Sequence, residues 1–308
     1  MNIVEKIDTT WEEFVSNNDV DNTKYIYRGH TNSISNTNFS EWKLISLFNR
    51  FYTNSNFKFR QFLSQQLEEN LFQSTYGKYK CLENKNLANS NTITKLYYLQ
   101  HYGVPTCLLD FTYNPLIALY FAITNLKGHS GGEYDLDTGI PKFYNNEYYI
   151  SIYKIDYNQL TTKLNLKNLE HTDNKLFLNY DYYGINFYRN QKRAFVALDL
   201  NPKETLKSSE NYNLENQSSC FILYDNYETQ DLGFEEFIEY YAKENNLNCE
   251  TPLIQIYNIK YNSVFKLRPN RPNSISLFEF LKSKGISGSN LFNDFQGLKY
   301  DFNFFHER

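Results

Sequence analysis

Residues 98–123 read YLQHYGVPTCLLDFTYNPLIALYFAI, a stretch that sets polar and titratable residues between two apolar segments. His101, Tyr102, Asp110, Thr112 and Asn114 all fall within fourteen positions. A run this apolar is expected to be buried, and polar groups carried into a buried setting need partners or a chemical role. The stretch is therefore the first candidate for a functional site.

The same stretch predicts its own local structure. A helix over 93–102 is expected to end at Gly103, which Pro105 follows closely. A short buried strand is expected over 106–111, and it would carry Asp110. Asn114 then suits the cap of a helix over 115–126, with Pro115 as its first residue.

The remainder of the chain predicts an α+β fold. Helices come first, several strands follow, and a helix closes the chain, an order that favours α+β over a regular βαβ wind. We expect one large domain over 1–308, with a central mixed or antiparallel sheet flanked by helices and segment 40–102 as an insertion or subdomain. The expected helices are 11–17 with Thr9 or Thr10 as cap, two within 42–71, and 274–284; the expected strands are 24–29 ending in a glycine turn, 148–155, 193–200, 219–224 and a β-rich region over 251–266.

Composition excludes several classes of protein. Aromatic residues make up 18% of the chain, which argues against disorder of the whole. A formal net charge of -4 argues against a protein dominated by phosphate contacts to nucleic acid. No apolar run is long enough to span a membrane, and residues 1–17 lack a secretory signal pattern, so we expect a cytoplasmic protein with no membrane partner. The four cysteines and five histidines form no metal-binding spacing, so reduced buried thiols and no metal are expected.

Two motifs resemble the FRG domain family. One is the strand motif Tyr27-Arg28-Gly29; the other is the long pattern QHYG-x-PT-x-LLD-[aromatic]-T-x-x-P-L-x-AL-[aromatic]-FA, which residues 100–122 reproduce nearly throughout. Two weaker elements, QKRAF at 191–195 and KGI…LFNDFQGL at 284–298, extend the resemblance over most of the chain. Cys107 stands where the family usually has Arg, and Arg193 where it usually has Gly, which weakens the expected anion binding and backbone approach at those points.

The YRG strand and the strand-turn-helix after it are also similar to ADP-ribosyltransferases that begin with an Arg-Gly strand. The resemblance implies NAD as a substrate: Arg28 would hold its pyrophosphate, and Tyr102 and Thr112 its nicotinamide. Glycine beside Arg28 would let a ligand approach the backbone closely. The NAD-binding residues implied are Arg28, Gly29, His30, His101, Tyr102 and Thr112.

The catalytic residues implied are Asp110 and Gln191, which would orient the ribose. Gln191 cannot ionise, so it can only position a group, and the identity of the catalytic acid stays open. Structural explanations stay open as well. Arg28 and Asp110 would pair with each other inside the fold, and Thr112 would bond local backbone.

The function implied is an NAD-dependent ADP-ribosyltransferase-like toxin or anti-phage effector that modifies a macromolecule, either protein or nucleic acid. An antitoxin or a phage-protein trigger would be its partner. The first alternative is a non-catalytic module that senses a nucleotide or a phage protein. The second is a nuclease, which needs clustered acids for metal ions, and the sequence shows no such cluster.

Overall fold

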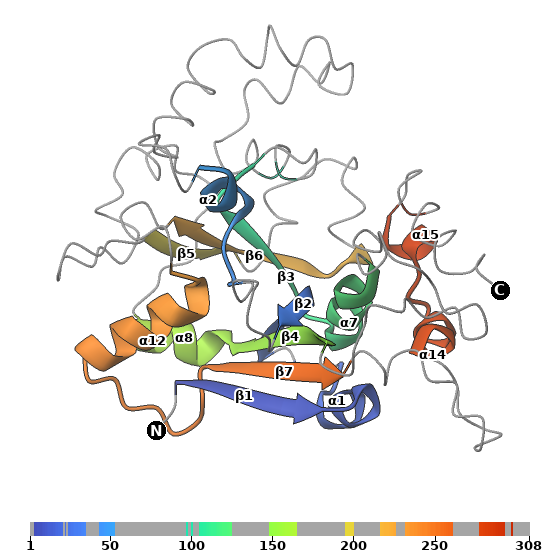
Figure 1. Cartoon of the computed structure of the whole chain (residues 1–308), viewed down its shortest axis with the longest axis horizontal. Coiled ribbons are helices and arrows are strands. Elements are labelled where there is room, and N and C mark those ends of the chain that lie inside the picture. The colour runs from blue at the N-terminus through green and yellow to red at the C-terminus, as the bar shows by residue number, and fades with distance from the viewer. Residues whose placement is uncertain are drawn as a thin grey trace, which may run out of the picture.

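The computed structural model has a seven-stranded mixed sheet with the strand order β1-β7-β4-β2-β3-β6-β5 (Figure 1). The structure describes residues 3–20, 22, 24–34, 43–52, 97, 100, 105–124, 148–164, 195–199, 216–225, 232–260, 277–292 and 297. Its strands are β1 (Val4–Thr9), β2 (Tyr25–Ile34), β3 (Leu108–Thr112), β4 (Tyr148–Asp156), β5 (Phe195–Asp199), β6 (Ser219–Asp225) and β7 (Ile254–Lys260). Only β1 and β7 pair in parallel, and the other neighbours in this sheet are antiparallel. The predicted α+β class with a mixed central sheet is confirmed.

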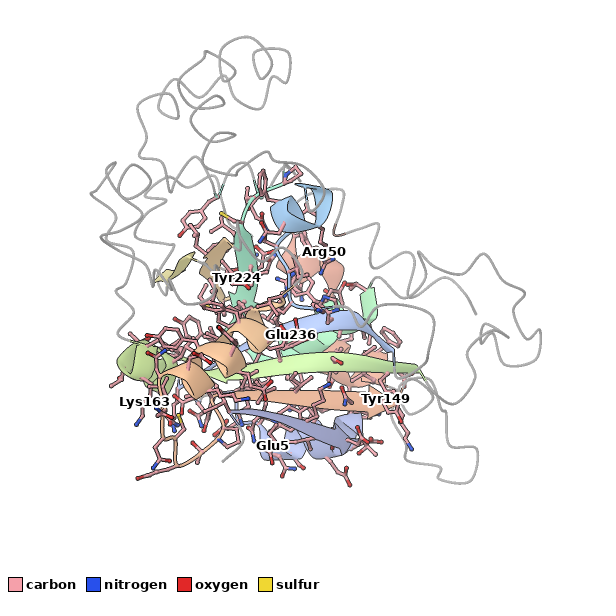
Figure 2. The ribbon with its side chains drawn as sticks, turned by 60° about the vertical axis from the view of Figure 1, so that its left-hand side comes forward. Glu5, Arg50, Tyr149, Lys163, Tyr224 and Glu236 are labelled. Carbon is pink, nitrogen blue, oxygen red and sulfur yellow. The ribbon has the colours of Figure 1, made fainter. Side chains whose placement is uncertain are left out.

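Helices cover both faces of the sheet. The described helices are α1 (Trp11–Asn17), α2 (Leu47–Tyr52), α7 (Pro115–Thr124), α8 (Tyr157–Leu164), α12 (Phe234–Glu244), α14 (Leu277–Ser283) and α15 (Gly288–Leu291). Alternation along β2 separates the two faces, because Ile26 lies in one apolar core and Tyr27 in the other. The first core includes residues of α8 and α12, which Figure 2 marks by Lys163 and Glu236. The second core contains residues of α1, α7 and α14.

Local sequence signals set three helix ends as predicted. Thr10 caps α1 in a reciprocal pair with Glu13, whose side chain accepts the Thr10 amide hydrogen. Asn114 Oδ1 accepts a hydrogen bond from Leu116 N at 2.9 Å at the start of α7. Gly285, with φ of 75°, follows the end of α14. These three ends confirm the predicted caps and the predicted glycine stop.

The sequence-based prediction was wrong at one strand end and incomplete elsewhere. Strand β2 does not stop in a glycine turn at Gly29 but continues to Ile34, because it pairs with β4 on both sides of that residue. Four elements had no predicted counterpart: β1, α8, α12 and α15. The domain assignment over 1–308 stays a prediction, since most of segment 40–102 lies outside the described residues.

Two further sequence expectations concern membranes and thiols. Among the residues that the structure describes, no helix is both long and apolar enough to cross a membrane. Cys107, Cys220 and Cys249 are buried and free of disulfide bonds, as predicted. Cys81 lies outside the described residues.

Candidate functional site

Strands β2 and β3 part from each other directly after a single register pair. Their described residues pair at Tyr27 and Thr112, whereas β3 pairs with β6 over all five of its residues. Next to that pair, the Arg28 guanidinium links the two strands in place of a backbone ladder. Its Nη1 donates to the Asp110 carbonyl oxygen at 2.6 Å and lies 3.6 Å from Asp110 Oδ2. The predicted pairing of Arg28 with Asp110 is therefore present.

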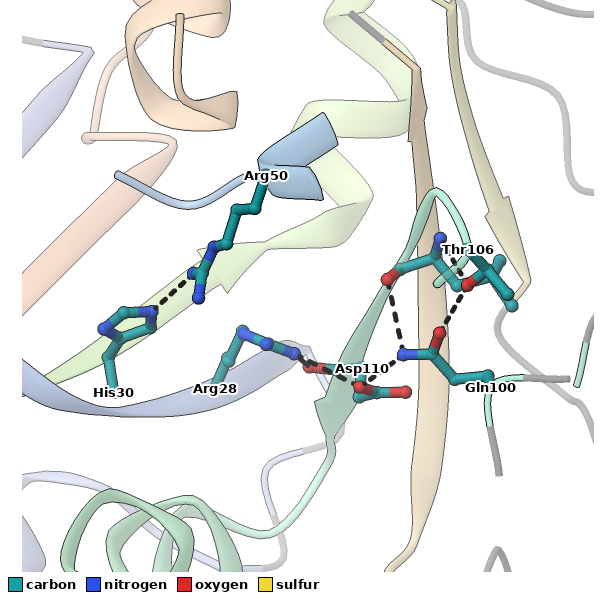
Figure 3. Close-up of polar contacts among 7 residues, drawn as sticks. Arg28, His30, Arg50, Gln100, Thr106 and Asp110 are labelled. Carbon is teal, nitrogen blue, oxygen red and sulfur yellow. Dashed lines mark hydrogen bonds and ion pairs between the residues drawn. The ribbon is translucent and has the colours of Figure 1, made fainter. Parts of the chain in front are cut away.

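Asp110 is held from the opposite side by an amide. Gln100 Nε2 donates to Asp110 Oδ2 at 2.9 Å, while Gln100 Oε1 accepts from the Thr106 hydroxyl (Figure 3). The Thr106 hydroxyl in turn accepts from Leu108 N at 3.2 Å. These contacts fix the carboxylate between a guanidinium and a carboxamide.

Asp110 is not buried, although the sequence predicted a buried carboxylate. Its own side chain is 51% exposed, although Leu108 and Thr112, which share its face of the strand, are buried, so the exposure is confined to this one position. Arg28 is the more enclosed partner, with a side chain 22% exposed. A carboxylate in this position remains accessible to a ligand while one of its oxygens is already hydrogen-bonded.

His30 contacts a second arginine. Arg50, on α2, approaches His30 with its Nη2 3.3 Å from His30 Nε2. Arginine only donates hydrogen bonds, so Nε2 must be the acceptor, and the proton of a neutral imidazole is then on Nδ1. The His30 side chain is buried and packs edge-on against Tyr153, with ring centroids 6.1 Å apart. His30 is therefore an enclosed side chain, and its predicted role in NAD binding stays a prediction.

The two arginines act on each other electrostatically. Arg50 is exposed as a whole residue, but partial desolvation of its guanidinium group lowers its pKa, and the positive charge of Arg28 lowers it further. Figure 3 shows both guanidinium groups entering the same region, Arg50 from α2 and Arg28 from β2. An anion bound there would favour both charged groups, since it would offset the repulsion between them.

Gly29 is required by helix packing. A Cβ atom at this position would lie 1.9 Å from the Ala118 carbonyl oxygen and 2.6 Å from Ala122 N. Both atoms belong to the backbone of α7, so the close approach at Gly29 is made by the helix. The packing of α7 thus accounts for the glycine, and the predicted role of Gly29 in NAD binding stays a prediction.

The contacts of the Thr112 hydroxyl are made with the backbone around the start of α7. Its buried hydroxyl donates to the Gln217 carbonyl oxygen at 2.6 Å and accepts from Asn114 N at 3.1 Å. These bonds hold the turn that starts α7, which is the structural explanation considered for this residue. His101, Tyr102 and Gln191 lie outside the described residues, so their predicted roles stay predictions.

Three residues of the cluster were not among the predicted site residues. Gln100 and Thr106 belong to the long motif, which could have singled them out as polar groups beside Asp110. Arg50 had no comparable signal, because a single basic residue on a short helix is ordinary. Among the described residues, no group of three or more His, Cys, Asp or Glu side chains is placed to hold a metal ion.

The fold and the site together define an α+β protein with a polar cluster of two arginines, a histidine and a carboxylate at the parting of two strands. Residues 23–131 match the model of the FRG domain. That segment, roughly a third of the chain, contains Arg28, His30, Arg50 and Asp110, while the two weaker elements of the resemblance lie beyond it. Comparisons with curated proteins and with solved structures gave no match.

Proposed function

We propose that this chain is an NAD-dependent ADP-ribosyltransferase-like effector that modifies a macromolecule, with Arg28 binding the pyrophosphate of NAD. The observation that carries the proposal is the Arg28–Asp110 pair at the parting of β2 and β3. A guanidinium offers parallel N–H donors that suit a phosphate group. The resemblance of the YRG strand to Arg-Gly strands of ADP-ribosyltransferases supports NAD as the source of that phosphate.

Asp110 has the chemistry that the transfer step needs. In that step the bond between ribose C1′ and the nicotinamide nitrogen breaks, and its electron pair leaves with nicotinamide. The acceptor then bonds to C1′ and gives up a proton. Positive charge develops on the ribose during this exchange, and a fixed carboxylate stabilises it. Asp110 is half-exposed and is oriented by Gln100, so it can serve in this way.

The biological setting comes from the family resemblance. FRG proteins resemble components of toxin and anti-phage systems, so the acceptor would be a protein or a nucleic acid of the host or the phage. An antitoxin or a phage protein would control the activity. The protein would work in the cytoplasm, where NAD is present.

The proposal is tested with NAD labelled on its ADP-ribose portion, incubated with the purified chain and with protein, RNA or DNA. We expect label on one class of acceptor. Asp110→Asn should lose transfer but retain NAD binding, because the amide keeps the shape of the carboxylate without its charge. Lys243→Met, an exposed residue on α12, serves as the control and should transfer as the parent does. The absence of both NAD binding and label transfer, with every acceptor, would refute the proposal.

One observation favours a second candidate, a non-catalytic module that senses a nucleotide. One Asp110 oxygen already accepts from Gln100 and lies near Arg28, so the carboxylate has a structural role without any ligand. Stabilisation of the fold by NAD or ADP-ribose, without release of nicotinamide, would select this candidate over the transferase.

A further inference from the structure

We propose that Arg50 is a second phosphate-binding residue of this site, so that Arg28 and Arg50 together take a diphosphate, and that His30 positions Arg50. The inference deepens the proposed function and rests on it for the choice of an ADP-ribose-type ligand. It does not require the transfer reaction, because a diphosphate can bind without being cleaved. Arg50 was not among the residues that the motifs singled out.

The first support is the way α2 is attached to the site. Phe48 N, on α2, donates to the Thr106 carbonyl oxygen at 3.0 Å. The side chain of the same Thr106 holds Gln100, which holds the Asp110 carboxylate beside Arg28. Thr106 therefore connects the helix that carries Arg50 with the carboxylate that contacts Arg28.

The second support is the charge of the cluster. Among the described residues whose charges shift the pKa of Arg50, Arg28 has the largest influence, and it lowers that pKa. Holding two like charges close to each other in a partly desolvated region is unfavourable, and a bound anion reverses the sign of the interaction. Asp110 supplies one negative charge, but it is half-exposed and lies next to Arg28. An anion bound between the two guanidinium groups would offset the repulsion between them.

The third support indicates a diphosphate. Arg28 comes from β2 and Arg50 from α2, so the two guanidinium groups reach the region from different elements (Figure 3). A dinucleotide-type diphosphate carries one negative charge on each of two linked phosphates, so each guanidinium can bind one of them. A nucleoside monophosphate has one phosphate group and would leave one guanidinium without a phosphate contact.

His30 acts through Arg50 in this arrangement. Its Nε2 accepts from Arg50 Nη2 at 3.3 Å, and its ring is buried against Tyr153. A neutral imidazole adds no positive charge for the phosphate but limits the rotation of the guanidinium. His30 is thus a positioning residue for Arg50, which differs from the direct contact with NAD that the resemblance implied.

The test is calorimetric titration of the full chain with ADP-ribose, AMP and adenosine. ADP-ribose cannot release nicotinamide, so binding is measured apart from transfer. We expect ADP-ribose to bind more tightly than AMP, and adenosine to bind weakest. Arg50→Met, which keeps the apolar stem of the side chain, should weaken ADP-ribose binding by about 10- to 100-fold, in line with the loss of a charge-assisted contact. Arg50→Met should weaken the binding of AMP by a smaller factor.

His30 variants separate positioning from folding. His30→Leu removes the acceptor and should weaken ADP-ribose binding, whereas His30→Gln offers an oxygen near the position of Nε2 and should restore much of it. His30→Leu should have little further effect in an Arg50→Met background, because both act on one interaction. Lys243→Met controls for the general loss of a positive charge.

Each outcome decides the inference. If Arg50→Met is too unstable to titrate, Arg50→Lys keeps the charge but lacks the fork of donors, and it should also weaken ADP-ribose binding. Failure of the parent chain to bind ADP-ribose, or unchanged affinity in folded Arg50→Met or Arg50→Lys, would overturn the inference. Binding that depends on Arg50 without any NAD turnover would uphold it and refute the transferase. NAD turnover that is unchanged in Arg50→Met would uphold the transferase and overturn the inference about Arg50.

Discussion

Replacing Gly29 with alanine should strongly destabilise the protein. The added methyl group would lie 1.9 Å from the Ala118 carbonyl oxygen, where ordinary contact begins at 3.4 Å, so helix and strand must separate locally by about 1.5 Å. The two atoms nearest to the added methyl group, Ala118 O and Ala122 N, belong to the backbone of α7, so no rotation of a side chain can relieve the clash. The substitution therefore forces α7 away from β2.

The size of the effect follows from what α7 buries. Nine of its ten residues are buried, which leaves the helix little freedom to move without opening gaps in the core. Overpacking a core costs about 1–3 kcal/mol, and lost contacts around a displaced helix add to that. We expect Gly29→Ala to lower the free energy of unfolding by about 3 kcal/mol or more.

Urea denaturation followed by far-ultraviolet circular dichroism measures this change, with Gly285→Ala as the matched control. A Cβ atom added at Gly285 would meet no other atom within 4 Å, but the φ of 75° at this residue is costly for alanine. The control should lose only about 1–2 kcal/mol, the cost of a left-handed backbone for a residue with a Cβ. A Gly29→Ala protein whose midpoint and slope match those of the parent would refute the packing argument.

Two further predictions concern helix ends. Burial raises the pKa of Glu235 from 4.5 to about 7, although its carboxylate accepts from Leu44 N, so the fold binds its proton more tightly than the unfolded chain does. The free energy of unfolding should therefore fall as pH rises from about 4.5 to about 7. The loss should stay below about 3 kcal/mol, because the Glu235 side chain is only partly buried. In Glu235→Gln, which cannot ionise, this pH dependence should be absent when the free energy of unfolding is measured against pH. Asn114→Ala deletes the acceptor for Leu116 N and should cost about 1 kcal/mol in thermal unfolding, while Asn114→Ser should retain most of that stability.

Local signals accounted for the elements whose ends depend on nearby residues. Thr10, Asn114 and Gly285 each act within a few positions of the helix end that they set, so their roles could be inferred from the sequence. Strand β2 was predicted too short because glycine commonly marks a turn. Here Gly29 serves a contact with α7, a helix that starts more than eighty positions later in the chain.

In the site, too, residues marked by motifs could be predicted, whereas their exposure and their distant neighbours could not. Arg28 and Asp110 were identified from motifs, and their pairing was one of the interpretations considered. The exposure of Asp110 depends on what covers β3 at that one position, because Leu108 and Thr112 on the same face are buried. Arg50 reaches His30 only because α2 is attached to Thr106, and no periodicity or spacing in the sequence carries that information.

The sequence by itself determined the α+β class, the capped helices and a polar segment beside an Arg-Gly strand, because these depend on short-range hydrogen bonding and apolar periodicity. The tertiary structure alone decided that β2 and β3 part after one pair, that Arg28 bridges them, and that Arg50 brings a second positive charge to the same region. Electrostatic interaction depends on distance in space, and residues twenty or eighty positions apart become neighbours only when the sheet and its helices pack together.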